Sequence, residues 1–356
     1  MTTAGNPFFT SKKQRNIIIV ALISVFLLLG TAGFFFYRIF FAGNVQLANK
    51  ETDYLYIPTH SSFNNVTTIL KEKGIIKNMR LFVWVAKQKG YLSKVKPGKY
   101  KIFNGMSTNS LVNLLRSGKQ EPVRVIFNSI RTKADMASRI SKQIEADSAS
   151  LIQQLNNAGL AKKFGLTTEN ILVLFIPNTY EFWWNTDAAT FIGKMYRYYA
   201  DFWNEERRNQ AAAIGLQPAE VSILASIVEK ETNKDDEKPM IAGVYLNRLA
   251  RGWHLEADPT LVFAANDYTI HRVLNCHKNI DSPYNTYKYP GLPPGPICIP
   301  SIASIQSVLH FTRHQYLFFC AKEDMTGYHN FAANITQHRV NAVRYQQELD
   351  KRKIKK

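Results

Sequence analysis

The segment ILASIVEKETNKDDEKP, residues 223–239, sets up the central question about this chain. Its apolar residues recur at helical spacing and a charged segment follows, which predicts an amphipathic helix that runs into a polar loop. Pro218 is a suitable first helical residue, because the first turn of a helix does not use the N–H that proline lacks. Two glutamates, Glu229 and Glu231, lie near the end of this predicted helix.

The two carboxylates fall on different sides of the helix axis. At about 100° per residue, Glu231 falls in the middle of the face that carries the large aliphatic side chains. Glu229 falls well away from that face, so we expect it to be solvated. The aliphatic residues are Val221, Ile223, Leu224, Ile227 and Val228.

An inward-facing Glu231 would have its charged form disfavoured in two ways. Apolar surroundings raise the pKa of a carboxyl group, and the negative end of the helix dipole raises it further. A carboxyl group that keeps its proton near neutral pH suits general acid catalysis. The alternative is a structural glutamate that pairs with a nearby Arg or Lys, but such a glutamate has no reason to accept both penalties.

An uncharged run from Ile17 to Tyr37 predicts a retained membrane anchor. It reaches the roughly 20 residues that a transmembrane helix needs. The alternative, a cleaved signal peptide, has a shorter apolar region. Lys12, Lys13 and Arg15 precede the run, and by the positive-inside rule they place the N-terminus in the cytosol. The expected segments are a cytosolic tail at 1–16, a single transmembrane anchor at 17–41 and a spacer at 42–53.

Length and composition indicate a folded protein with more than one compact unit. The chain has 356 residues, of which 46% are hydrophobic, and a formal net charge of +18. Such a charge is often a sign of nucleic-acid binding, but the expected topology puts the basic mass outside the cytosol. We therefore expect no nucleic acid, and either an anionic lipid or wall polymer as partner or simply a solvated surface.

Cysteine and histidine usage indicates neither a disulfide framework nor a metal site. The three cysteines, Cys276, Cys298 and Cys320, are widely spaced. We expect three unpaired, mostly buried thiols, and one disulfide with one free thiol is the alternative. His310 and His314 have the spacing of a helical metal pair, but no third ligand stands at a matching offset. No metal or cofactor is expected.

Alternating and helical patterns predict a small α+β module at 54–128, closed by the strand-like PVRVIF. Mostly helical segments follow, and the last third is richer in loops. Six short stretches in this order, ASIVEKET, AGVYLNRL, ADPT, YNTY, GLPPGPI and HNF, together resemble the endolytic murein transglycosylases of the MltG or YceG-like family. The upstream IPNTYEFWW also resembles a family segment, and the likeness covers about residues 54–345.

The resemblance implies an α+β fold with a single N-terminal transmembrane helix, a LysM-like subdomain at 54–128 and a mostly helical catalytic domain at 129–350. It implies lytic cleavage of the β-1,4 bond between N-acetylmuramic acid and N-acetylglucosamine within glycan strands, leaving 1,6-anhydro ends. The family's catalytic glutamate corresponds to Glu231. The resemblance further implies that the anchor lies in the inner membrane and that the catalytic domain is periplasmic or otherwise extracytoplasmic. Peptidoglycan strands would be its partners, with peptidoglycan synthases as further ones. A non-catalytic, membrane-anchored wall-binding or scaffold protein is the alternative.

One dominant acid suits this lytic chemistry, because the muramic acid C6 hydroxyl takes the place of water. Tyr284, Asn285, Thr286 and Tyr287 offer amide, hydroxyl and aromatic groups that suit sugar binding, or they form a loop packed by its two tyrosines. Glu229 either tunes the site or, as we favour, only solvates the helix.

Further candidates have structural alternatives. Asp258 either caps the following helix, the commoner use, or touches substrate. Asn247 and Arg248 are expected to pair with Glu229 or Glu237. Four aromatic residues either stack on sugars or form a core cluster: Tyr180, Phe182, Trp183 and Trp184. The family's common residues are replaced at Ile299, Ser301 and Asn334, which puts fine substrate contacts in doubt but not the acid.

Overall fold

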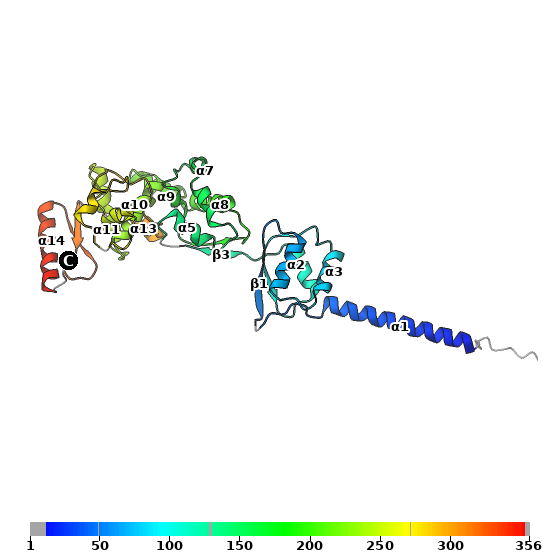
Figure 1. The fold of residues 1–356 in the computed structure, drawn as a ribbon. Coiled ribbons are helices and arrows are strands. Elements are labelled where there is room, and N and C mark those ends of the chain that lie inside the picture. Colours follow the sequence, from blue (N-terminus) through cyan, green and yellow to red (C-terminus); the bar gives the residue numbers. More distant parts are fainter. Residues whose placement is uncertain (1–11, 49, 128–129, 271, 353–356) are drawn as a thin grey trace, which may run out of the picture. The chain divides into compact units, whose positions relative to one another are not determined.

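The computed structural model describes residues 12–48, 50–127, 130–270 and 272–352. Contacts divide the chain into two compact units (Figure 1). The smaller unit comprises residues 1–122 and 183–185, and the larger one comprises residues 123–182 and 186–356. Each unit has its own hydrophobic core, as expected of parts that fold around separate interiors.

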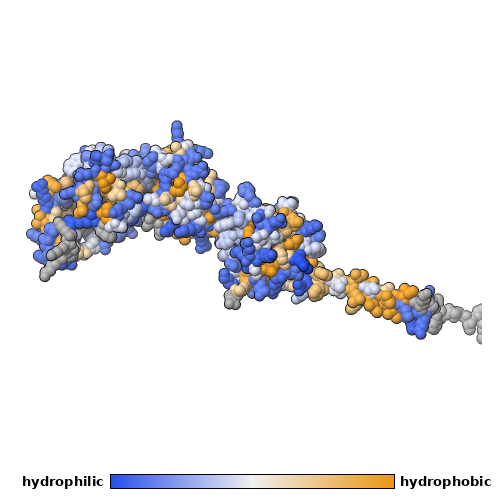
Figure 2. All heavy atoms as spheres, in the orientation of Figure 1, coloured by the Kyte–Doolittle hydropathy of each residue, from blue (hydrophilic) through white to orange (hydrophobic). Residues whose placement is uncertain are grey.

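Helix α1 (Lys12–Phe40) exposes its apolar side chains. Figure 2 shows hydrophobic residues along α1 and hydrophilic ones at its N-terminal end. Among the described residues, it is the one single helix that is long and apolar enough to cross a membrane. Exposed apolar surface of this extent is unfavourable in water, so the helix fits the predicted anchor. Residues 1–11 of the predicted tail lie outside the described residues.

The smaller unit packs three helices and a two-stranded antiparallel sheet around one core. Polar caps start the helices: Ser62, Asn78 and Ser107 each accept a backbone N–H of the first turn. Gly118 ends the third helix at φ 73°, a left-handed conformation that favours glycine. The elements are β1 (Thr52–Ile57), α2 (Phe63–Glu72), α3 (Met79–Gln88), β2 (Gly98–Phe103) and α4 (Thr108–Ser117).

The larger unit is mostly helical and has two further antiparallel pairs of short strands. Its first elements are β3 (Val123–Ile126), α5 (Lys133–Ile140), α6 (Ser148–Leu155), α7 (Ala158–Lys163), the 3₁₀ turn η1 (Ile171–Leu174), β4 (Thr179–Phe182), α8 (Ala188–Phe202) and α9 (Glu205–Ala213). The elements that follow are α10 (Pro218–Glu231), α11 (Lys238–Ala250), α12 (Asp258–Ala265), the 3₁₀ turn η2 (Asn275–Asn279), α13 (Ile302–Leu309), β5 (Phe318–Ala321), β6 (His329–Ala332) and α14 (Ile335–Lys351).

The strand predicted to close the small module belongs to the larger unit instead. Strand β3 pairs with β4, with Val123 opposite Phe182 and Ile126 opposite Thr179. Val125 and Phe127 are buried in the larger core, so the long-range pairing determines where this segment belongs. The predicted boundary residues 128 and 129 themselves lie outside the described residues.

Helix α10 runs through the core of the larger unit and packs against α11, α12 and α13. Every residue from Val221 to Val228 is buried, so the helix has no solvated face along most of its length. The last helix, α14, packs on strands β5 and β6. Asn334, one of the departures from the family pattern, caps α14 by accepting the N–H of Gln337 at 2.9 Å. The three cysteines are unpaired, as predicted, but they are not mostly buried: Cys298 is buried, Cys320 is half-buried and Cys276 is exposed.

Candidate active site

Glu231 is the last residue of α10 and points into a cleft of about 980 Å³. The buried body of the helix fixes its position, and Thr232 leaves the helix in an extended conformation. Other walls of the cleft come from α12, from the segment 268–273 and from α14. The predicted inward orientation of Glu231 is therefore what the structure has.

Tyr245, on α11, is the hydrogen-bond partner of Glu231. Its buried hydroxyl donates to Oε1 of the carboxyl group, which leaves Oε2 for a group in the cleft. Burial raises the pKa of Glu231 to about 7, and the negative charge of Asp258 acts in the same direction. The Tyr245 hydrogen bond and the Arg248 guanidinium oppose this rise. Glu231 is thus poised to exchange a proton near neutral pH.

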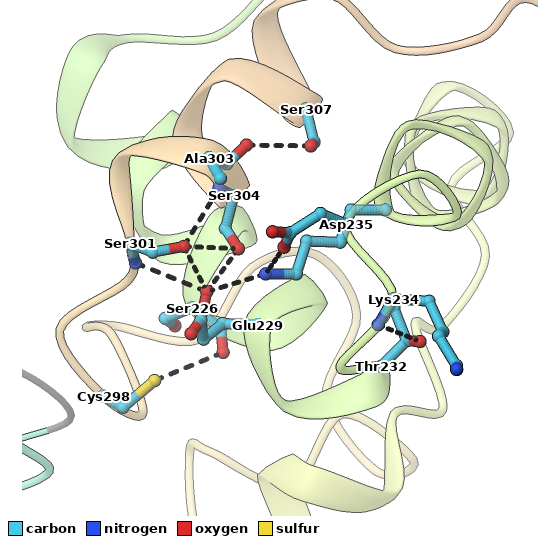
Figure 3. Close-up of polar contacts among 11 residues, drawn as sticks. Ser226, Glu229, Thr232, Lys234, Asp235, Cys298, Ser301, Ala303, Ser304 and Ser307 are labelled. Atoms are coloured by element: carbon cyan, nitrogen blue, oxygen red, sulfur yellow. Dashed lines mark hydrogen bonds and ion pairs between the residues drawn. The ribbon is translucent and has the colours of Figure 1, made fainter. Parts of the chain in front are cut away.

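Glu229 is only partly exposed, with 21% of its side-chain surface accessible, which corrects the prediction of a solvated residue. The wheel assumed a solvent-facing side, but α13 packs there. Figure 3 shows Ser301 and Ser304 of this neighbouring segment directed at Glu229. The Ser301 hydroxyl donates to Glu229 Oε2 at 2.6 Å, Ser304 donates to the same oxygen, and Lys238 Nζ lies 3.3 Å from it.

This contact set keeps Glu229 ionised. Burial opposes ionisation, but the hydrogen bonds from Ser301 and Ser304 and the charge of Lys238 outweigh it and hold the pKa of Glu229 below its usual value. Two carboxyl groups two residues apart therefore have opposite shifts in pKa, which separates a structural anion from a candidate acid.

Asp258 lines the cleft, but it does not cap α12 as predicted. It is the first helical residue, the cap position is Ala257, and no side chain provides the cap hydrogen bond. Instead, the Tyr287 hydroxyl donates to Asp258 Oδ1 at 2.6 Å. Asp258 is exposed, so its carboxylate is accessible from the cleft.

The other three residues of the predicted sugar-binding loop have their side chains within the protein. Asn285 is fully buried and donates to the carbonyls of Lys278 and Ile280 at 2.9 and 2.8 Å. Thr286 is also buried, and its hydroxyl accepts the N–H of Ala257 at 3.0 Å. Tyr284 packs on Phe263 with ring centroids 4.7 Å apart. In this structure Asn285 and Thr286 hold the loop that presents Tyr287, and their contact with sugar stays a prediction.

Asn247 and Arg248 do not pair with Glu229 or Glu237, which corrects another prediction. Asn247 donates to the carbonyls of His314 and Tyr316 at 2.8 and 2.9 Å. Arg248 donates to the carbonyls of Leu317 and Leu255. Both side chains thus bind backbone carbonyls of segments that are neither helix nor strand.

Glu237 and the predicted aromatic and histidine residues also have defined places. Glu237 accepts the backbone N–H of His329 at 2.6 Å, and the ring Nδ1 of His329 lies 2.8 Å from its other oxygen. Tyr180 and Phe182 are core residues, whereas Trp183 is 51% exposed. His314 Nε2 lies 2.9 Å from the carbonyl of Met240. Among the residues that the structure describes, no group of three or more His, Cys, Asp or Glu is arranged to hold a metal ion.

Two features of the site were not predicted from the sequence. Tyr245 is a core-spaced aromatic in AGVYLNRL, and only the packing of α11 on α10 brings its hydroxyl to Glu231. Arg131 and Tyr268, which also line the cleft, lie far apart in the chain. Charge and aromaticity were visible at these positions, but no pattern linked them to Glu231.

Comparison with known proteins gives consistent matches over both units. The model of the YceG-like family matches residues 55–344. An endolytic murein transglycosylase of Bacillus subtilis (strain 168) is 28% identical over 303 residues, covering 79% of this chain and 81% of the relative.

A second relative and a solved structure extend the comparison. The endolytic murein transglycosylase of Streptococcus pneumoniae serotype 2 (strain D39) is 26% identical and covers 92% of this chain, which spans 65% of that relative's length. A crystal structure of a YceG-like protein from Listeria monocytogenes is similar with a TM-score of 0.53 and 27% identity, covering 82% of this chain and 99% of the other.

Proposed function

The chain belongs to the YceG-like family, and from this premise we propose that it is a membrane-anchored endolytic murein transglycosylase. It cleaves the β-1,4 bond between N-acetylmuramic acid and N-acetylglucosamine within peptidoglycan strands. The names of its relatives in Bacillus and Streptococcus support this activity. The observation that carries the proposal is Glu231, a carboxyl group with a raised pKa at the wall of a large cleft.

In the proposed reaction Glu231 acts first as acid and then as base. Its proton passes to the glycosidic oxygen as the bond from C1 of the muramic acid breaks. The carboxylate then takes the proton of the C6 hydroxyl of the same sugar, whose oxygen bonds to C1 and forms the 1,6-anhydro ring. Ordinary glycosidases need a second carboxylate as nucleophile or water-activating base. Here the attacking group belongs to the substrate, so positioning supplies much of the rate.

Two neighbouring groups support this acid in the proposed mechanism. The Tyr245 hydroxyl on Oε1 fixes the carboxyl group so that Oε2 carries the transferred proton. Asp258, held by Tyr287, places a negative charge at the cleft that favours positive charge developing at C1. The proposal gives Glu229 no part in the chemistry, since its carboxylate accepts hydrogen bonds from Ser301 and Ser304 and pairs with Lys238.

The proposed location follows from α1 and the charges before it. We propose that α1 anchors the chain in the cytoplasmic membrane with its N-terminus in the cytosol, and that both units lie on the outer side. Residues 54–122 would form a LysM-like subdomain, and the larger unit would be the catalytic domain. Termination of glycan polymerisation is the proposed role, with peptidoglycan synthases as partners.

Mass spectrometry of the products tests this function. Purified peptidoglycan incubated with the full chain should yield fragments with anhydro ends, each lighter by one water than the product of hydrolysis. Reducing ends would identify a hydrolase instead. No fragments at all, combined with retained binding to the wall polymer, would identify a non-catalytic wall-binding protein.

A further inference from the structure

A second hollow of about 860 Å³ adjoins the cleft that contains Glu231. Arg131 and Tyr268 line both spaces. The guanidinium carbon of Arg131 lies 4.2 Å from the centroid of the Tyr268 ring, a distance at which cation and ring attract each other. This pair therefore forms a common wall between the cleft and the hollow.

Backbone contacts tie this wall to the helix that carries Glu231. The N–H of Ile299 donates to the carbonyl of Ile130, next to Arg131, at 2.7 Å. Two residues before Ile299, the N–H of Ile297 donates to the hydroxyl of Ser226 on α10 at 3.0 Å. The position of the hollow relative to Glu231 is therefore fixed by the core of a single unit.

The hollow is basic. Of the described residues that line it, three are cations, Arg131, Arg139 and Lys142, and one is an anion, Asp135. The Asp135 carboxylate accepts the N–H of Thr132 at 3.2 Å as part of the cap of α5. The lining thus carries an excess of positive charge.

The neighbouring cleft has charges of both signs. It contains the carboxyl groups of Glu231 and Asp258, and the cations Lys230 and Arg272 line it together with Arg131. An anionic substituent on a bound strand would be repelled by Asp258 and attracted to the cations beyond the Arg131–Tyr268 pair. The hollow, whose described lining has Asp135 as its one anion, thus offers a place for negative charge next to the cleft that would hold the sugar bond.

The neutral groups of the hollow suit a peptide. Thr132, Ser138 and Asn266 offer hydroxyl and amide groups, and Ile130 and Ala134 offer apolar surface. Each of the two volumes lies toward the upper end of the range of about 300–1,000 Å³ for pockets that bury a small ligand. A sugar pair in the cleft therefore leaves the hollow free for a further part of the strand.

We propose that this hollow binds the carboxylates of the short peptide carried by a muramic acid beside the scissile bond. The inference rests on the proposed function and extends it, because it makes peptide-bearing strands the preferred substrate. Arg139 and Lys142 are exposed on and just after α5, so their replacement is compatible with a folded protein.

The test compares two substrates with the full chain and its double variant Arg139→Gln/Lys142→Gln. Glycan strands freed of phosphate-containing polymers are used with their peptides attached, or after an amidase has removed the peptides. The readout is the ratio of kcat/KM for peptide-bearing strands to kcat/KM for peptide-free strands. Lys162→Gln/Lys163→Gln, which removes two exposed cations at the end of α7, is the matched control.

We expect the double variant to lower this ratio on the order of tenfold, as two partly solvated charge contacts would, and the control to keep the wild-type ratio. An equal ratio in wild type and double variant, or an equal fall in the control, would overturn the inference while leaving the proposed function intact. A wild-type protein that releases no anhydro-ended product from either substrate would overturn the proposed function, and this inference with it.

Discussion

The proton on Glu231 links stability to pH. The pKa of its carboxyl group is about 7 in the folded chain and 4.5 in the unfolded reference. Between these values the folded state binds a proton that the unfolded state has lost, so the stability contributed by Glu231 falls as pH rises. This contribution is fully present below pH 4.5 and absent above about 7.

Glu231→Gln should therefore melt higher than wild type at pH 8, because glutamine avoids burying a charge. A difference of about 5 °C is expected, and it should shrink toward pH 5. Thermal unfolding of both proteins at the two pH values measures it. A difference that does not change with pH would mean that the carboxyl group of Glu231 is not ionising in this range.

Tyr245→Phe should move the pH dependence of activity. Wild-type kcat/KM should fall as pH rises through about 7, because the acid must carry its proton. The Tyr245 hydroxyl stabilises the ionised form of Glu231, so its removal should shift this fall upward by about one pH unit. A pH–rate profile checks the shift. If the rate fell but the profile stayed in place, Tyr245 would have only a packing role.

Single residues were predictable where one helix determined their orientation. The wheel placed Glu231 correctly because the aliphatic residues of α10 do face the core. It misplaced Glu229, since the wheel cannot show that α13 brings Ser301 and Ser304 to the opposite side. The wheel could not identify Tyr245, because this residue contacts Glu231 from a second helix, α11.

The end of α10 is held in place by the anion at Glu229. Replacement by glutamine weakens its contacts to Ser301, Ser304 and Lys238, so Glu229→Gln should lower the free energy of unfolding by about 1–3 kcal/mol. Because the folded pKa of Glu229 is lowered, the contribution of its charge is present above pH 4.5 and lost as pH falls. Chemical denaturation at pH 7 and at pH 4 measures both effects.

The same variant should keep the type of product, anhydro ends, because Glu229 does not face the cleft. A stable Glu229→Gln protein that makes no product would instead place Glu229 in the catalytic machinery. This outcome would contradict the division of roles between the two glutamates.

Local signals predicted many elements well, and the exceptions come from partners distant in sequence. Polar caps and Gly118 mark α2 to α4 in the sequence and in the structure. The strand β3 was assigned to the wrong unit, because its partner β4 lies more than 50 residues later. The YNTY loop was recognised as special, but the sequence could not show that Asn285 and Thr286 turn inward.

At the scale of the whole molecule, α1 should determine location and leave the chemistry to the larger unit. Ile39 packs against the core of the smaller unit, so a truncation that removes residues 1–36 retains this contact. We expect the truncated protein to leave the membrane fraction without detergent and to cleave isolated strands within about twofold of the wild-type kcat/KM. Cell fractionation and the product assay measure both properties.

A truncated protein that stayed in the membrane fraction would show that another surface, such as a basic one, attaches the protein to the membrane. The long apolar helix α1 and the mixed α+β character were predictable from composition and periodicity over long segments. The division into units was less predictable, because it depends on which strands pair.

The central claim is that Glu231 transfers the proton in a lytic cleavage, and the release of anhydro-ended fragments by Glu231→Gln tests it most directly. The variant is compared with wild type and with Glu229→Gln, and circular dichroism checks that all three are folded. Glu231→Gln should release anhydro-ended fragments on the order of 10³-fold more slowly than wild type. A folded Glu231→Gln protein that still forms anhydro ends at more than a tenth of the wild-type rate would contradict the account.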